Sequence, residues 1–383
     1  WMVFSHYTER GWTVDNLWHI FTDFYGGQYV PLAFLSYLVL YAGFGYDPFY
    51  FHMFSLLLHI GCVCLVWKLI SSLLRVHGGV SEKQILYVNF ITTLLFAVHP
   101  INVEAVAWIS ALKVLLYAFF YLLGLLCYLR YIRTSKIFYY VLTIGCFLCS
   151  FWGKEQAVTF PLALLIVDWF TNRNMKNLEV WSEKMSFLIM AFFFGIITVL
   201  SQGKGPYEMI FPLYQRLLFG CFALVEYITK SLLPVNLNFF YPFPIVLGEE
   251  PPLHYYLYPV VLLFLMGWII AYRNNRYLVF GVLLFLVNLL FSIHLFNMSR
   301  HAIVADRYMY LSYVGIAFLI ANGIWWLRKR LSYFKAALVF LFFYCFFLSV
   351  YTFHYTKKWE NTTMVKKYTK EVLEKRLNGS NHL

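Results

Sequence analysis

Charged residues are scarce in this sequence of 383 residues. Asp, Glu, Lys and Arg make up 13% of it, and hydrophobic residues make up 61%. Soluble domains are about 25% charged, because a surface that faces water on all sides needs that charge. A soluble globular protein is therefore excluded, and the same hydrophobic excess excludes a disordered chain.

Cysteine is also rare, with seven in the whole chain. The cysteines lie mostly inside apolar stretches, where thiols pack as small hydrophobic groups. No CxxC pair comes with zinc-like partners, so the sequence gives no sign of a zinc site. The length and the low cysteine count together exclude a disulfide scaffold.

Aromatic residues are abundant instead, at 22% of the chain, and the mean hydropathy is +0.66. This composition suits broad lipid contact with aromatic belts at both membrane interfaces. The net charge is +12, but the basic residues gather in short loops between apolar stretches. That pattern indicates a membrane protein with no nucleic-acid partner. We therefore expect an all-α, polytopic transmembrane helical bundle.

Apolar stretches long enough to approach a membrane span recur along the chain. The stretch 216–233 is ambiguous, because Glu226 and Lys230 lie four residues apart there, at the spacing of a helical ion pair. We expect that stretch to be a re-entrant or interfacial helix, which gives about 10–11 spans in all. The expected spans are 50–74, 85–99, 114–130, 137–152, 157–170, 185–201, 255–272, 277–293, 308–327 and 335–353.

The distribution of Lys and Arg sets the orientation. One set of loops holds 14 basic residues and the opposite set holds 7, so the first set is expected to be cytoplasmic. Residues 1–48 then form an external loop with short helices, 49–353 the transmembrane domain, and 354–383 an external amphipathic tail. The chain is expected to be an integral, multi-pass membrane protein.

Polar residues at the apolar border are the informative ones in a membrane protein. They form four groups, all on the predicted external side. Each group alone also fits helix capping or interface anchoring, but together they place cations and carboxylates where a lipid phosphate headgroup would lie. The groups contain Tyr29; His99, Glu104 and Lys113; Lys154 and Glu155; and Arg300, Asp306, Arg307 and Tyr310.

Four motifs built on these groups resemble the transmembrane-and-tetratricopeptide-repeat O-mannosyltransferases and their bacterial relatives, which are glycosyltransferases of the GT-C class. The resemblance implies a GT-C-like bundle, a sugar donor carried on polyprenyl or dolichyl phosphate, and transfer to a protein or glycan hydroxyl on the external or lumenal face. It also implies repeats after the last membrane helix, and a location in a bacterial inner membrane or the endoplasmic reticulum membrane. The motifs are GGQYVPLAFLSYLVLYAGFGYDPF (26–49), LLFAVHPINVEAVAWIS (94–110), GKEQAVTFP (153–161) and ADRYMYLSYVG (305–315).

The resemblance also suggests roles for these residues. Arg307, with Arg300 or Lys154, would bind the donor phosphate, and Asp306 would orient Arg307 or act as the base. His99 and Glu104 would line the cleft. Further substrate contacts are expected from Glu155, Tyr310, Tyr29 and Lys113.

One feature of the family has no match in this sequence. The acidic pair of the family's first external loop would fall at or before Trp1, although Glu9, Asp15 and Asp23 lie nearby. We therefore expect the principal base upstream of Trp1, in a chain that is a fragment without its first helix and repeats. No cofactor or resident metal is expected, although a divalent metal stays open.

Two other functions remain open at this point. A lipid or solute transporter would use the same polar residues as a translocation path, but transporters commonly show inverted repeats, which are not evident here. A non-catalytic membrane homologue or scaffold would lack the base altogether. The expected partners of the enzyme are membrane lipid, a polyprenyl-phosphate-linked sugar, and an acceptor protein or glycan.

Overall fold

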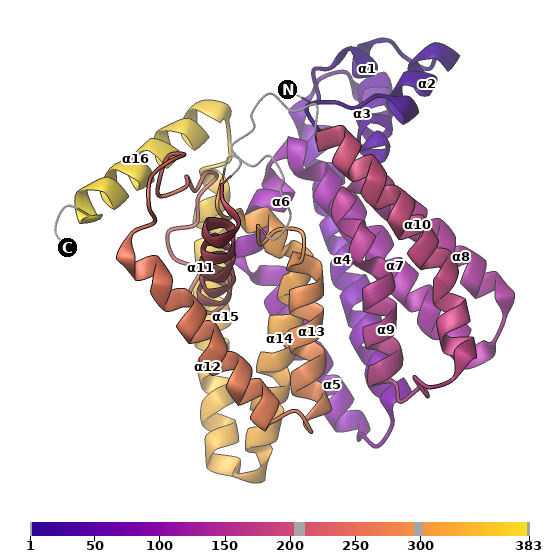
Figure 1. The fold of residues 1–383 in the computed structure, drawn as a ribbon, viewed down its shortest axis with the longest axis vertical. Helices are drawn as coiled ribbons and strands as arrows, with labels where there is room; N and C mark the ends of the chain where they lie inside the picture. Colours follow the sequence, from indigo (N-terminus) through magenta and orange to yellow (C-terminus); the bar gives the residue numbers. More distant parts are fainter. Residues whose placement is uncertain (1, 203–210, 295–301, 381–383) are drawn as a thin grey trace. The chain divides into compact units, whose positions relative to one another are not determined.

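The computed structural model describes residues 2–202, 211–294 and 302–380, and helices dominate that part of the chain (Figure 1). The only other regular pairing in these ranges is two isolated β-bridges, Tyr25 with Gln28 and Tyr241 with Val304. The predicted all-α fold is therefore confirmed. The α-helices are α1 (His6–Glu9), α2 (Val14–Thr22), α3 (Pro31–Phe44), α4 (Pro48–His77), α5 (Glu82–Val98), α6 (Val103–Ala107), α7 (Leu112–Thr134), α8 (Ile137–Gly153), α9 (Phe160–Phe170), α10 (Leu178–Gln202), α11 (Leu213–Leu232), α12 (Leu257–Ala271), α13 (Arg276–Leu289), α14 (Met309–Trp326), α15 (Leu331–Lys357) and α16 (Thr362–Ser380).

Six helical stretches in the described ranges are long and apolar enough to cross a membrane: 48–77, 109–134, 178–201, 253–271, 306–329 and 331–357. A seventh candidate is the pair 82–98 and 100–107, which bends by 50° at its break. Two further expected spans, α8 and α13, form shorter apolar helices. The protein is thus an integral, multi-pass membrane protein.

The expected span at 157–170 is wrong in its length. A 3₁₀ turn, η3 (Glu155–Thr159), occupies its start, and α9 has 11 residues. At 1.5 Å per residue such a helix is about 16 Å long, well short of a hydrocarbon core of about 30 Å. Pro161 in the first turn of α9 suits a helix that begins there, after the 3₁₀ turn.

The chain divides into two compact units. Unit 1 comprises residues 1–93, 109–206 and 320–325. Within it, α7 packs against both α4 and α8, and α1, α2 and α3 form a group of their own beside them (Figure 1). The end of α8 approaches α7 closely, because a Cβ on Gly153 would lie 2.7 Å from the backbone nitrogen of Tyr117. Glycine is therefore required where the GKEQ motif begins.

Unit 2 comprises residues 94–108, 207–319 and 326–383 and contains α6, α11, α12, α13, the first part of α14, α15 and α16. Helices α13 and α14 cross at two glycines, since a Cβ on Gly315 would lie 2.5 Å from the carbonyl oxygen of Gly281. Small residues commonly permit such close approach of membrane helices. Helix α15 packs against α6 and against the 3₁₀ turn η1 (Pro100–Asn102).

Helix α11 covers the ambiguous stretch 216–233 and is not among the candidate spans of the described chain. The chain that follows α11 runs back along that helix. The Tyr241 ring faces Lys230 near the end of α11, and Glu250 accepts a hydrogen bond from Tyr214 near its start. An interfacial or re-entrant position for α11 stays a prediction that these contacts support.

Candidate functional site

The motif that contains His99 interrupts the helical structure within unit 2. Helix α5 ends at Val98, and the Nδ1 atom of His99 accepts a hydrogen bond of 3.2 Å from the backbone of Ile101. The His99 ring lies 4.2 Å from the ring of Tyr313. Pro100, which cannot continue α5, opens a 3₁₀ turn there, and the buried His99 caps that turn.

Glu104 and Arg307 are joined across 203 residues of sequence. The guanidinium of Arg307 donates to one carboxylate oxygen of Glu104 at 2.5 Å, and its backbone nitrogen donates to the other at 2.7 Å. The Glu104 side chain is fully buried, whereas that of Arg307 is 20% exposed. Two motifs that the sequence analysis grouped thus form one site. The carboxylate that orients Arg307 is Glu104 rather than Asp306.

Two aromatic rings face the guanidinium of Arg307. Its central carbon lies 5.4 Å from the ring centre of Trp108 and 5.1 Å from that of Tyr308. Both rings are half-buried. Cation–π attraction therefore adds to the ion pair in holding the cation in place while one side of it remains exposed.

Asp306 is fully buried and has a different partner. The hydroxyl of Tyr241 donates to both of its carboxylate oxygens, at 2.9 and 3.0 Å. Burial, and then the nearby charge of Asp306, raise the pKa of Tyr241 well above its ordinary value, so that this tyrosine remains a donor. No ion pair of Asp306 occurs within the described ranges.

Two further predicted site residues, Tyr310 and Arg300, belong to the ADRYMYLSYVG motif or lie just before it. Tyr310 is buried, and its ring packs edge-on against Phe96 at 5.3 Å. A substrate contact by Tyr310 stays a prediction that this packing does not favour. Arg300 lies outside the described residues.

Four predicted site residues belong to unit 1. Lys113 donates hydrogen bonds to Gln28 and to the Met2 sulfur, so it joins the GGQYV motif to the start of α7. Tyr29 donates to the carbonyl of Phe21, and burial raises its pKa. Lys154 is buried, and Glu155 is half-buried at the start of η3. Their roles in substrate binding stay predictions.

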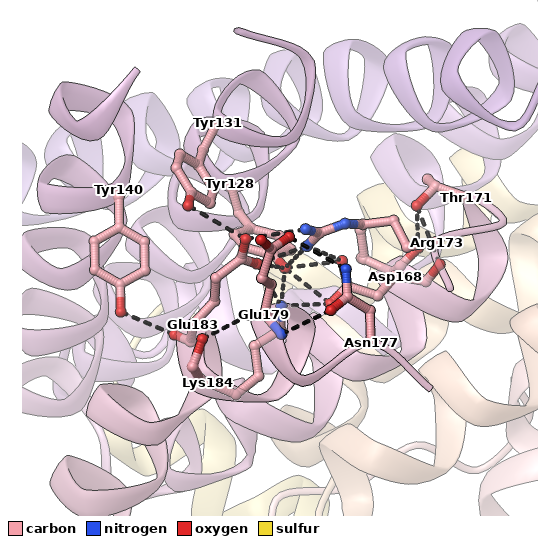
Figure 2. Close-up of polar contacts among 12 residues, drawn as sticks. Tyr128, Tyr131, Tyr140, Asp168, Thr171, Arg173, Asn177, Glu179, Glu183 and Lys184 are labelled. Carbon is pink, nitrogen blue, oxygen red and sulfur yellow. Dashed lines mark hydrogen bonds and ion pairs between the residues drawn. The ribbon is translucent and has the colours of Figure 1, made fainter. Parts of the chain in front are cut away.

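Unit 1 also contains a buried ionic cluster that the sequence analysis missed (Figure 2). Lys184 of α10 pairs with Asp168 of α9 at 2.5 Å, and both side chains are fully buried. Arg173 lies 3.2 Å from Asp168 and 2.6 Å from Glu183. Tyr128 of α7 donates to Asp168, which ties a third helix to the cluster.

The cluster is balanced in charge, with two acidic and two basic residues. The pKa of Arg173 rises above its ordinary value, chiefly because of its hydrogen bonds to Glu183. A signal for the cluster was present in the sequence: Asp168 falls within an expected apolar span, where a carboxylate is costly unless it is paired. Because the charges within the cluster are matched, we infer that it holds the helices together and does not bind a ligand.

Residues that could hold a metal ion do not gather in the described part of the chain. No group of three or more His, Cys, Asp or Glu side chains there has suitable geometry. Unit 2 presents a fixed, partly exposed cation, Arg307, beside the buried carboxylate of Glu104.

Comparison with curated proteins finds relatives named protein O-mannosyl-transferases. TMTC2 of Mus musculus is 32% identical over 189 residues, which cover 45% of this chain and 21% of the relative. TMTC2 of Homo sapiens is 33% identical over 189 residues, with the same shares. Tmtc3 of Drosophila melanogaster is 28% identical over 172 residues, covering 40% of this chain and 18% of the relative.

The chain spans about a fifth of the length of these curated relatives. No family model matches it, and no solved structure matches it. The relatives bear out the resemblance drawn from the four motifs. The chain is therefore a multi-pass membrane protein related in sequence to the transmembrane-and-tetratricopeptide-repeat O-mannosyl-transferases.

Proposed function

We propose that this chain is the membrane part of a glycosyltransferase that moves a sugar from a polyprenyl- or dolichyl-phosphate donor to a hydroxyl of a protein or glycan. The observation that carries the proposal is the Glu104–Arg307 pair, in which a buried carboxylate fixes a partly exposed guanidinium. A fixed guanidinium suits the phosphate of such a donor, because it binds phosphate oxygens through two parallel hydrogen bonds. The names of the relatives favour mannose as the sugar.

The proposed reaction needs a base and a stabilised leaving group. A carboxylate takes the proton of the acceptor hydroxyl, whose oxygen attacks the anomeric carbon of the sugar. The bond from that carbon to the phosphate oxygen breaks, and its electron pair leaves with the lipid phosphate, which Arg307 stabilises. Of the two carboxylates we assign the proton to Asp306, because Glu104 is held by the charged guanidinium and the backbone of Arg307, whereas Asp306 accepts hydrogen bonds from the neutral hydroxyl of Tyr241. Lys154 or Arg300 remains the proposed second cation.

The test is donor consumption by the full-length protein in lipid nanodiscs, with radiolabelled dolichyl-phosphate mannose and no ion gradient. Arg307→Lys keeps a charge for the buried Glu104, and so keeps the fold, but loses the planar fork that grips phosphate. We expect it to lower transfer roughly 10- to 100-fold, with an unchanged unfolding temperature. Arg75→Ala is the matched control, because Arg75 lies in an exposed ion pair with Glu82.

Full transfer activity in Arg307→Lys and Arg307→Gln would contradict the assignment of Arg307. A wild-type protein that moves the labelled lipid between leaflets without cleaving it would indicate a transporter. A wild-type protein that does neither would indicate a non-catalytic scaffold.

A further inference from the structure

Helix α11 carries a lysine whose burial needs an explanation. The side chain of Lys230 is 3% exposed, and its ammonium lies 3.4 Å from Glu226, which is 25% exposed. Lysine is almost never buried to this extent unless it is paired. A pair with a neighbour on its own helix would form equally well at the surface, so the burial of Lys230 indicates a further partner inside unit 2.

That partner is reached through Tyr241. The Lys230 ammonium lies 4.6 Å from the centre of the Tyr241 ring, and the hydroxyl of the same ring donates to both oxygens of Asp306. Lys230 also interacts electrostatically with the Asp306 carboxylate itself. The Tyr241 side chain thus lies between the Lys230 ammonium, which faces its ring, and the Asp306 carboxylate, which accepts from its hydroxyl.

Among the charged groups of the described residues near Asp306, Lys230 is the cation whose charge attracts it. Arg307 is held by Glu104 through both carboxylate oxygens. Glu104 and Glu226 repel the Asp306 carboxylate, and Lys230 attracts it. In the described residues, the titratable groups that interact with Asp306 through charge or a hydrogen bond include Glu104, Glu226, Lys230, Tyr241, Tyr351, Tyr355 and Tyr368.

We propose that Lys230 is a positioning residue for Asp306: its ammonium favours the ionised carboxylate and holds the tyrosine ring that orients it. Glu226 disfavours the ionised form of Asp306, because it repels the Asp306 carboxylate and pairs with the Lys230 ammonium. The proposal rests on the proposed function only for its effect on sugar transfer. The interaction itself can be tested without transfer.

The direct test measures the protonation of Asp306 in the full-length protein. A hydrophobic carbodiimide, dicyclohexylcarbodiimide, adds to protonated carboxyl groups in apolar surroundings, and mass spectrometry locates the adduct. Removing a nearby cation disfavours the ionised form of a buried carboxylate. We therefore expect Lys230→Met to raise the labelling rate of Asp306 about tenfold at alkaline pH, where the wild-type carboxylate is ionised, and Lys230→Arg to restore the wild-type rate.

A second variant separates this effect from a loosened fold. Glu226→Gln removes a repulsive charge, so it should slow the labelling of Asp306, whereas loosening would speed it in both variants. Lys370→Met is the matched control, because Lys370 forms a pair with Glu374 at the same helical spacing on α16, but exposed. Unchanged or absent labelling of Asp306 in Lys230→Met, or faster labelling in Glu226→Gln as well, would overturn the proposal.

Transfer kinetics give the second readout. If Lys230 acts through Tyr241 and Asp306, then Lys230→Met should lower kcat and leave the donor KM unchanged. Tyr241→Phe keeps the ring but cuts the hydrogen bond to Asp306, so the double variant should lose about as much kcat as the worse single variant. A raised donor KM in Lys230→Met would overturn the positioning role. A wild-type protein without transfer activity would refute the proposed function, and the labelling result would still decide the role of Lys230.

Discussion

At the scale of single residues, the carboxylate of Glu104 should determine how well Arg307 binds a donor. Glu104→Gln keeps the shape of the side chain but removes the charge that fixes the guanidinium. We expect a donor KM raised about tenfold and a loss of about 1–3 kcal/mol in unfolding free energy, since a buried partner is lost. Transfer kinetics and thermal unfolding measure the two effects. Glu374→Gln, in an exposed pair, is the control, and equal effects in both variants would contradict this role.

Sequence reasoning identified some of these residues and missed their pairing. The motifs around Glu104 and Arg307 were predicted to share a site, and the structure joins them directly. The partner of Asp306 could not be predicted, because Tyr241 lies in a loop between α11 and α12 with no motif around it. The ion pair of Lys230 was predictable from helical spacing, but its contact with Tyr241 depends on how the chain turns after α11.

At the scale of helices, the ionic cluster at Asp168 should hold α7, α9 and α10 together. Asp168→Asn leaves the buried ammonium of Lys184 with Glu183 alone, which it shares with Arg173, and breaking one side of a buried pair costs about 3–5 kcal/mol. We expect a clear fall in the unfolding temperature in detergent. The pair Arg75–Glu82 is exposed, so Glu82→Gln should cost about 0–1 kcal/mol.

A second variant tests whether charge compensation is the cause. Asp168→Leu with Lys184→Met removes both charges and keeps the balanced pair of Arg173 with Glu183. Replacement of a whole buried pair by apolar residues is often neutral or stabilising, so this double variant should recover most of the loss. A double variant as unstable as Asp168→Asn would show instead that the hydrogen bonds to Tyr128 matter more.

The helices themselves were predictable where the apolar run was long. Hydropathy alone located α4, α7, α10 and α15, because lipid requires continuous apolar surface. It overestimated the length of the helix at α9, because the 3₁₀ turn η3 begins two residues after Gly153, whose backbone packs on α7. Hydropathy does not contain this information, because a 3₁₀ turn and an α-helical turn can have the same composition.

At the scale of the whole molecule, the Lys and Arg residues of the loops between helices predict an orientation. The loop between α9 and α10, with Arg173 and Lys176, belongs to the loops expected on the cytoplasmic side, which requires η3 and α9 together to bring the chain back to that side. The segment after α15 lies with the Arg307 group in unit 2, because Trp359 packs in a cluster with Val103 and Leu237. If the positive-inside rule governs this chain, that segment and the proposed transfer site share the external or lumenal face.

Cysteine labelling can test this orientation directly. Glu360 and Lys176 are both exposed, so Glu360→Cys and Lys176→Cys provide one reporter on each expected side. In sealed vesicles of known orientation, a membrane-impermeant maleimide should label Glu360→Cys only from the external or lumenal side. It should label Lys176→Cys only from the cytoplasmic side, and permeabilisation should make both reactive. The wild-type chain, with its own seven cysteines, sets the background. The reverse pattern would place the Arg307 site in the cytoplasm, where transfer to an external acceptor could not occur.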